Sequence, residues 1–224
     1  SNFVDEYESD GDIVASVVYD PTTPDFSTSI RQMLLLDQSI NRHKRLASYL
    51  GEELEFEPRA RGDIDLIFMA ANAKTAKLIR PQLRFHYAGN IPTYATSAIF
   101  EPGSSNNADL NGLIFPEIPW LLEPGPTATE LQETLKTYWG AAATKRARFY
   151  AMGYDAYRLM PLLVNQPRAI RGQVQGMTGE LWMSNDRRLH RQLLWARIDR
   201  GKPKRLPDPQ LATPEVVETP LSSN

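Results

Sequence analysis

Hydrophobic residues in the first half of the chain gather in short runs separated by turn-forming residues. The run Ile64–Ala71 is almost wholly apolar and is bounded by Gly62 and Asn72, which is typical of a strand buried on both faces of a parallel sheet. A helical pattern over 73–85 and a second short run at Thr93–Thr96 follow it. This order predicts a strand–helix–strand crossover unit.

Further strands and a helical region flank this unit. The β-branched run Ile13–Tyr19 predicts a first strand, and Leu113–Phe115 predicts another after the crossover. Between the first strand and the crossover, helical spacing extends from Ile30 to Leu50 and ends at Gly51, a residue suited to a helix C-cap. Pro81 lies inside the crossover helix and is expected to kink or split it.

The second half of the chain begins with helices and ends with a hairpin. Thr127–Trp139 predicts one helix and Ala147–Leu163 a stronger one. The apolar residues of the second helix make one stripe, and Arg148, Asp155 and Arg158 lie off it. The stripe comprises Phe149, Met152, Ala156, Leu159, Met160 and Leu163. The glycines of Gly176-Met-Thr-Gly179 are interpreted as turn residues that open a hairpin with arms at Leu181–Met183 and Leu189–Ile198.

Together these elements predict an α/β fold of three layers, with a mostly parallel sheet flanked by helices and a C-terminal β-hairpin. The domain is assigned to residues 13–206. Residues 1–12 hold five acids and no base, and are interpreted as a linker or tag remnant. Residues 207–224 contain four prolines and no periodicity, which indicates a disordered tail.

Composition excludes several classes of function. The formal net charge is −2, so the overall field gives no reason to expect nucleic acid or an anionic membrane as partner. The absence of cysteine excludes disulfides and thiolate metal sites. The histidines His43, His86 and His190 are isolated from one another, which argues against a transition-metal site. No apolar run is long enough to span a bilayer.

A search for catalytic groups finds no convincing set. Ser97 follows a predicted strand, but no glycine flanks it as a nucleophile elbow requires. Asp63 and Asp65 lie at the beginning of a strand, whereas open parallel sheets bind ligands beyond the carboxyl ends of their strands. The sequence therefore predicts neither an enzyme nor a cofactor.

The carboxyl-end rule nevertheless predicts where a binding site would lie. The three predicted parallel strands are followed by polar residues that should converge on one rim: Asp20, Thr22, Thr23, Asn72, Thr96 and Ser97. Such a rim can hydrogen-bond a small ligand or a partner. Ordinary loop polarity explains these residues equally well.

Two other segments are candidates for partner binding. The first, Asp109–Leu122, offers Asp109, Asn111, Phe115, Pro119 and Trp120. Its aromatic side chains could be anchors on a rigid loop, although filling the core is the more frequent role. In the second segment, Arg59-Ala-Arg61, positive charge could steer a partner. A salt bridge from this segment to Asp63 or Asp65 would explain it as well.

Two motifs resemble proteins of the type I periplasmic-binding-protein fold. Val14–Tyr19, followed by Asp-Pro-x-x-Pro-Asp-Phe, resembles the entry into the second lobe of that fold. Arg148–Leu159, with its Tyr-Asp-Ala core, resembles the helix that follows the last strand of that lobe. The resemblance implies a second lobe together with a segment that returns toward the first lobe.

Within this fold the chain is similar to one family. The matching segments occur in order between Ile13 and Leu206: Arg59–Phe68, Tyr94–Ser97, Leu110–Phe115, Pro119–Leu122, Gly176–Leu181 and Arg188–Trp195. They resemble the penicillin-binding protein activator lipoproteins, the LppC/LpoA family. The family's lipidated cysteine, N-terminal helical-repeat domain and first lobe have no counterpart in these residues.

The resemblance implies a non-catalytic periplasmic module of an outer-membrane lipoprotein. Its partner would be a class A penicillin-binding protein, the synthase that builds peptidoglycan, and it would need no cofactor. Membrane contact would come only through a lipid anchor that this chain lacks. The alternative is a solute-binding or sensor domain for an amino acid or a similar ligand. Asp20 is the only charged residue at the predicted rim, which weakens that alternative.

Overall fold

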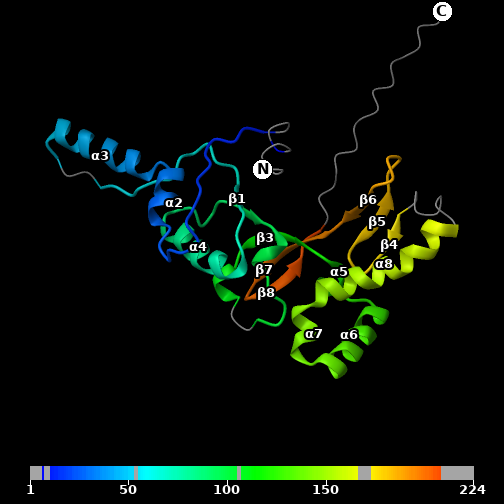
Figure 1. Cartoon of the computed structure of the whole chain (residues 1–224). Helices are drawn as coiled ribbons and strands as arrows, with labels where there is room; N and C mark the ends of the chain where they lie inside the picture. The colour runs from blue at the N-terminus through cyan, green and yellow to red at the C-terminus, as the bar shows by residue number, and fades with distance from the viewer. Residues whose placement is uncertain (1–6, 8–10, 53–54, 105–106, 166–172, 208–224) are drawn as a thin grey trace, which may run out of the picture.

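The computed structural model of the chain describes residues 7, 11–52, 55–104, 107–165 and 173–207 (Figure 1). The predicted linker at 1–12 and the predicted tail at 207–224 therefore lie almost entirely outside the described residues. The helices are α2 (Ser27–Met33), α3 (Leu36–Leu50), α4 (Ala73–Phe85), the 3₁₀ turns η1 (Ser97–Ile99) and η2 (Ala108–Leu110), α5 (Pro119–Leu122), α6 (Pro126–Trp139), α7 (Ala141–Lys145) and α8 (Ala147–Asn165). The strands are β1 (Ile67–Met69), β2 (Thr93–Ala95), β3 (Leu113–Glu117), β4 (Val174–Gln175), β5 (Glu180–Met183), β6 (Leu189–Gln192), β7 (Leu194–Asp199) and β8 (Lys202–Arg205).

A five-stranded mixed sheet occupies the centre of the molecule, in the order β1–β2–β3–β7–β8. β1, β2 and β3 are parallel, with Ile67 opposite Thr93 and Thr93 opposite Leu113. β7 is antiparallel to both β3 and β8. The path from β1 through α4 to β2 confirms the predicted crossover unit. β1 is shorter than the predicted strand because only residues 67–69 pair with β2.

Helices α2 and α4 pack on one face of this sheet and form the larger core with it. Ile67 of β1 and Ala95 of β2 point into that core, whereas Phe68 and Tyr94 are half-buried on the other face. That other face carries an apolar cavity of about 340 Å³ beside Phe68, Tyr94 and Trp195. The mixed sheet flanked by helices agrees with the predicted α/β class.

The predicted first strand, Ile13–Tyr19, is not a strand in the structure. The segment is extended and its side chains alternate between exposed and half-buried, but its backbone forms no ladder with β1. The Arg61 guanidinium donates to the Val14 carbonyl (3.1 Å), and the Tyr19 hydroxyl donates to the Ala70 carbonyl (2.7 Å). A cavity of about 330 Å³ lies between the segment and β1. Hydrogen bonds from the Arg61 and Tyr19 side chains thus hold the segment 13–19 in place of the expected backbone pairing with β1.

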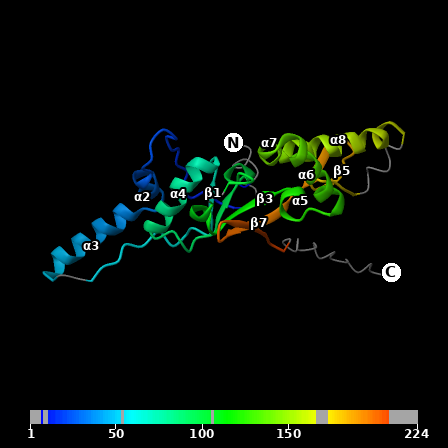
Figure 2. The same cartoon turned by 90° about the horizontal axis from the view of Figure 1, so that it is seen from below.

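The helical region of the first half differs from the prediction at two points. Leu35 has a left-handed φ of 54°, which divides the region into α2 and α3. Gly51 confirms the predicted C-cap, because it is also left-handed and donates its N–H to the Ala47 carbonyl. α4 runs through Pro81 without splitting, since its buried side packs against the sheet and offsets the missing donor. α3 extends away from the sheet (Figure 2).

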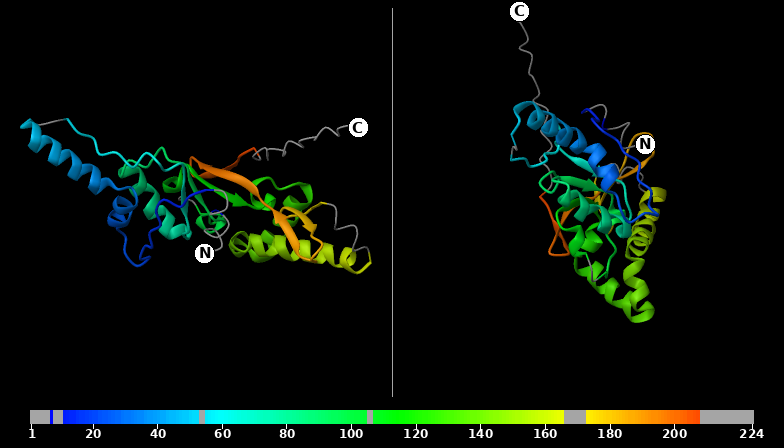
Figure 3. Two further views of the ribbon diagram at one scale, coloured as in Figure 1. Left: turned by 90° about the horizontal axis from the view of Figure 1, so that it is seen from above. Right: turned by 90° about the vertical axis from the view of Figure 1, so that its left-hand side faces the viewer.

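The remaining helices form a second layer beside the sheet, seen together with β4–β6 at the opposite end of the molecule from α3 (Figure 3). Its core joins α5, α6, α7 and α8 through small and large apolar residues: Ile118, Trp120, Ala128, Leu135, Ala143, Ala147 and Ala151. Within the described parts of the chain, no helix has the length and hydropathy required to cross a membrane.

The apolar stripe of α8 does not face the core in the structure. Of its six residues only Leu159 is buried, and the exposed members are Phe149, Met152, Ala156, Met160 and Leu163. The face that is buried recurs every four residues: Ala147, Ala151, Asp155 and Leu159. The buried face carries the charged Asp155 among its apolar residues, so apolar periodicity alone did not single it out. The small alanines allow α8 to pack against α5, in the core that both share with α6 and α7, and this contact decided the orientation.

The predicted hairpin is confirmed in its first half and corrected in its second. β5 and β6 pair antiparallel, with Trp182 opposite His190. The chain then leaves that small sheet, and β7 pairs with β3 in the central sheet instead of extending the hairpin. Gly179 supports the turn interpretation, because its φ is 142° and an added Cβ would lie 2.1 Å from the Gln192 carbonyl oxygen.

A buried ion pair joins the two layers. Glu117, at the end of β3, is 1% exposed and receives the guanidinium of Arg148 on α8. Arg148 also donates to the carbonyls of Ser97 (3.0 Å) and Phe100 (2.9 Å), and the Ile118 N–H donates to Glu117 (3.0 Å). These bonds satisfy the buried carboxylate and tie α8 to the end of the sheet.

Candidate functional site

The predicted rim residues follow the ends of extended segments but serve mainly local structure. Asp20 accepts bonds from the Thr22 N–H (2.8 Å) and hydroxyl (2.7 Å), and the Thr23 N–H donates to the Asp20 carbonyl (3.3 Å). The hydrogen bonds from Thr22 lower the pKa of Asp20 below its ordinary value. Asn72 caps α4 by accepting the Thr75 N–H (2.9 Å).

The other end of the rim is likewise engaged. Thr96 and Ser97 begin the 3₁₀ turn η1, and the Ser97 carbonyl accepts from Arg148. The bond from Tyr19 to Ala70 brings the loop at 20–23 beside the end of β1. The loop at 20–23 and the end of β1 therefore lie next to each other, as the rim prediction requires. The Asp20 side chain accepts hydrogen bonds within its own loop, and the Asn72 side chain accepts one from the first turn of α4.

The segment Asp109–Leu122 is held largely by the core. Phe115 is 0% and Trp120 is 2% exposed, so the interpretation of these aromatics as surface anchors is corrected and the core-filling alternative holds. Asn111 is structural as well, because its side chain accepts the Gly201 N–H (2.8 Å). Asp109 is exposed on η2, and Pro119 starts α5, a position that its missing N–H suits.

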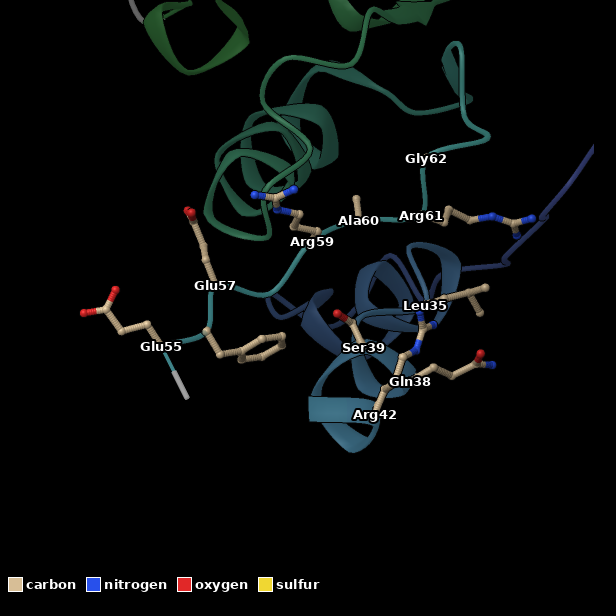
Figure 4. Close-up of a pocket in the computed structure, with 11 residues that line it drawn as sticks. Leu35, Gln38, Ser39, Arg42, Glu55, Glu57, Arg59, Ala60, Arg61 and Gly62 are labelled. Carbon is tan, nitrogen blue, oxygen red and sulfur yellow. The ribbon is translucent and has the colours of Figure 1, made fainter. Parts of the chain in front are cut away.

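Arg61 is anchored by the salt bridge that the sequence offered as an alternative. Its guanidinium forms a fork with the Asp63 carboxylate, at 2.5 Å for each of the two bonds. The bond to Arg61 lowers the pKa of Asp63, and the same contact raises that of Arg61. The side chain points toward the N-terminal segment, away from Arg59 (Figure 4).

Arg59 lies at the surface between two cavities. On one side, a cavity of about 610 Å³ lies between α3 and the segment 55–62, where Arg42, Glu55 and Glu57 join Arg59 in its lining (Figure 4). On the other side, a cavity of about 490 Å³ is lined by Arg59 and by Arg84. We call this surface the Arg59 groove. It carries charges of both signs, and its arginines can bind carboxylates.

The Arg59 groove and the rim expose charged and polar side chains. Among the described residues, no group of three or more histidines, aspartates or glutamates could hold a metal ion. The Arg59 groove offers guanidinium and carboxylate groups in open solvent, where they can attract a charged partner.

A structural role that the sequence did not predict belongs to Asp155 of α8. This buried carboxylate accepts from the Met177 N–H (2.7 Å) and from both the N–H and the hydroxyl of Thr178 (2.7 Å each). The Met177 carbonyl in turn accepts the Trp120 N–H (3.1 Å). A Cβ at Gly176 would lie 2.7 Å from the Asp155 carboxylate. The Gly176-Met-Thr-Gly179 motif therefore forms a turn and also supplies the hydrogen-bond donors that bind the Asp155 carboxylate.

Replacing Asp155 by alanine is expected to lower the free energy of unfolding by about 2–4 kcal/mol, because two backbone donors and a hydroxyl lose a charged acceptor. Urea unfolding followed by circular dichroism measures this change. Asp109→Ala, which removes an exposed carboxylate, is the control and should change stability by less than about 0.5 kcal/mol. Equal effects of the two substitutions would contradict the assigned role of Asp155.

Comparison with known proteins identifies relatives of the chain. A family model described as "LppC putative lipoprotein" matches residues 1–201. A relative from Vibrio cholerae serotype O1 (strain ATCC 39541), named penicillin-binding protein activator LpoA, is 31% identical over 174 residues, which are 75% of this chain and 28% of the relative. A relative of the same name from Photobacterium profundum is 27% identical over 170 residues, or 75% of this chain and 27% of the relative. The chain thus spans between a quarter and a third of the length of these relatives.

Solved structures agree on the fold. The C-domain of Haemophilus influenzae LpoA, described as a regulator of PBP1A, matches 73% of this chain and 49% of its own with a TM-score of 0.53 and 19% identity. The leucine-binding protein LivK of Thermotoga maritima matches 92% of this chain and 54% of its own with a TM-score of 0.50 and 18% identity. Both likenesses support the periplasmic-binding-protein type of fold that the sequence motifs predicted.

Proposed function

Because the chain belongs to the LppC family, we propose that it is a non-catalytic module of a periplasmic outer-membrane lipoprotein that stimulates a class A penicillin-binding protein. The observation that carries this proposal is the family match over residues 1–201, together with the name of the Vibrio cholerae relative, an activator of penicillin-binding proteins. The regulator would act in peptidoglycan synthesis by binding the synthase.

The surface chemistry supports a binding role. The Arg59 groove presents arginines and glutamates in open solvent, and the Asp20 and Asn72 side chains at the rim are engaged in local hydrogen bonds. A solute-binding role is the alternative for this fold, but polar groups already used for turns and caps leave little to recognise a small ligand. We therefore propose the Arg59 groove as the surface that contacts the synthase.

The proposal is tested by adding the purified 224-residue chain to a class A synthase and measuring its glycosyltransferase and transpeptidase rates. An increase in either rate, together with direct binding in a pull-down, supports the proposal. The absence of both binding and stimulation by the folded chain would refute it for this part of the protein.

Replacing Arg59 by glutamate is expected to slow association with the synthase about three- to tenfold at low salt, because reversing an exposed charge alters electrostatic steering. Arg59 is exposed, so the unfolding midpoint should be unchanged. Surface plasmon resonance at two ionic strengths measures the effect, which should shrink as salt rises.

Arg146→Glu is the matched control, since it reverses an exposed arginine on the other layer. If both variants slow association equally, the effect is one of net charge, and the Arg59 groove is not the contact surface.

A further inference from the structure

Two arginines of α4 donate to the same neutral oxygen. Arg80 is 4% exposed, and its guanidinium donates to the carbonyl of Asn111 (3.2 Å). It also donates to the Thr93 hydroxyl (3.1 Å) and to the Gly89 carbonyl (3.4 Å). Arg84 lies one turn later on the helix and donates to the same Asn111 carbonyl (2.6 Å). Two positive charges are thus held close together by uncharged acceptors.

These two charges lack an acidic partner within the protein. In the ranges that the structure describes, neither Arg80 nor Arg84 forms a salt bridge. Burial, and then the neighbouring charge of Arg84, lower the pKa of Arg80 below its ordinary value. An anion bound to Arg84 would offset the repulsion between the two guanidinium groups. The pair therefore favours a bound anion.

The half of the Arg59 groove next to α4 gives a ligand access to Arg84. Its cavity of about 490 Å³ is lined by Arg59 and Arg84, and both side chains are exposed. Gly89, whose carbonyl accepts from Arg80, lines the same cavity. The bond to Asn111 engages Nη2 of Arg84, so the Nε and Nη1 donors can form a fork with a carboxylate.

This cavity lies at the amino ends of the parallel strands. Its walls are formed by residues 57–64, which precede β1, and by residues 84–91, which precede β2. α8 meets the sheet at the opposite ends, where Arg148 donates to the Ser97 carbonyl after β2 and pairs with Glu117 of β3. A further part of the domain that packed on α8 would therefore lie at the other end of the sheet from the cavity (Figure 3).

The lining of the cavity also restricts the kind of anion. Glu57 is the only acid among the described residues that line it. Its carboxylate accepts hydrogen bonds, so a suitable ligand carries N–H donors as well as carboxylates. A protein segment rich in aspartate and glutamate supplies both, from its backbone and its side chains. Phosphate supplies no N–H donor, and the cavity is much larger than one phosphate group.

We propose that an acidic segment of the synthase binds in this cavity, with its carboxylates on Arg84 and Arg59. The inference rests on the proposed function only in naming the synthase as the source of the segment. It assigns the contact to the half of the Arg59 groove next to α4 and makes Arg84 the second arginine of the contact surface, in place of Arg61, which is already paired with Asp63.

The first test titrates the 224-residue chain, labelled with nitrogen-15, with acetyl-tetraglutamyl amide and follows the backbone amides by NMR. The shifts should be confined to residues 57–61 and 84–91. Arg84→Gln should weaken binding by about tenfold or more, because a forked guanidinium–carboxylate pair is lost. Arg146→Gln, at an exposed arginine of the second layer, is the control and should bind as the wild type does.

Two further probes examine the chemistry of the ligand. Acetyl-tetraglutaminyl amide, which has the same backbone without the charges, should give no shifts. Inorganic phosphate should bind about tenfold more weakly than the acidic peptide, because it offers no N–H donor to Glu57. Equal binding of phosphate and peptide would overturn the assignment to a protein segment. Shifts outside the two segments, or equal affinity of Arg84→Gln and wild type, would overturn the carboxylate site itself.

The second test measures binding of a class A synthase by surface plasmon resonance. Arg84→Glu should weaken binding by about tenfold relative to Arg146→Glu, and acetyl-tetraglutamyl amide should compete with the synthase. Circular dichroism verifies that the variants are folded. A chain that binds the peptide but no synthase would refute the proposed function and support the carboxylate site. Synthase binding that neither Arg84→Glu nor the peptide reduces would overturn this inference and leave the proposed function intact.

Discussion

Replacing Arg148 by alanine is expected to lower the free energy of unfolding by about 3–5 kcal/mol, because it leaves the Glu117 carboxylate buried without its cation. Glu117 is almost fully inaccessible, and Arg148 is the cation paired with it. The same substitution also removes the donors to the carbonyls of Ser97 and Phe100. Urea unfolding monitored by circular dichroism measures the loss.

Two further variants separate charge from geometry. Arg148→Lys retains the positive charge but not the fork of parallel donors, so an intermediate loss is expected. Glu117→Leu combined with Arg148→Met removes both charges and should recover much of the stability that Arg148→Ala loses. Arg146→Ala, two residues away and exposed, should cost less than about 0.5 kcal/mol. If Arg148→Ala costs no more than this control, the ion pair does not hold the layers together.

Trp120→Ala is expected to cost about 3–5 kcal/mol, because it empties the centre of the core between α5, α6 and α8. The indole is almost completely buried, and the backbone N–H of the same residue donates to the Met177 carbonyl. The substitution keeps that backbone bond, so the loss should come from packing. A thermal melt and a urea titration measure it.

Trp139→Ala is the matched control, since Trp139 is the same residue type and is 53% exposed at the end of α6. Its loss should be below about 1 kcal/mol. At a temperature where both variants are folded, neither should alter binding of a synthase at the Arg59 groove. If the Trp120→Ala protein is as stable as the wild type but does not bind the synthase, Trp120 belongs to the contact surface and not to the core.

Much of the fold was predictable because its signals are local. A buried strand bounded by glycine and asparagine, a helix and a second strand were read correctly around α4. Gly51 was interpreted correctly as the C-cap of a helix and Gly179 as a turn residue. Both positions have a backbone conformation that favours glycine, and such a position is set by a few neighbouring residues. The family resemblance rested on motifs in order along the chain, and it was confirmed.

The candidate site was less predictable. The sequence grouped Arg59 with Arg61, and both line the two cavities. Only the structure showed that Arg61 is forked on Asp63 whereas Arg59 is exposed. The rim was predicted from strand ends, but the engagement of its side chains in caps and turns depends on rotamers that a residue pattern does not specify. Burial removed Phe115 from the list of surface candidates.

By itself, the sequence identified the family through the motifs that resemble it. It also determined the α/β class and the positions of most helices and turns, since these follow from spacing and capping within a few residues. Tertiary structure alone decided which apolar face of α8 is buried, that Ile13–Tyr19 remains unpaired, and that β7 leaves the hairpin for β3. Each of these outcomes depends on contacts between residues far apart in the chain, such as Arg148 and Glu117. Local periodicity carries no information about such a partner.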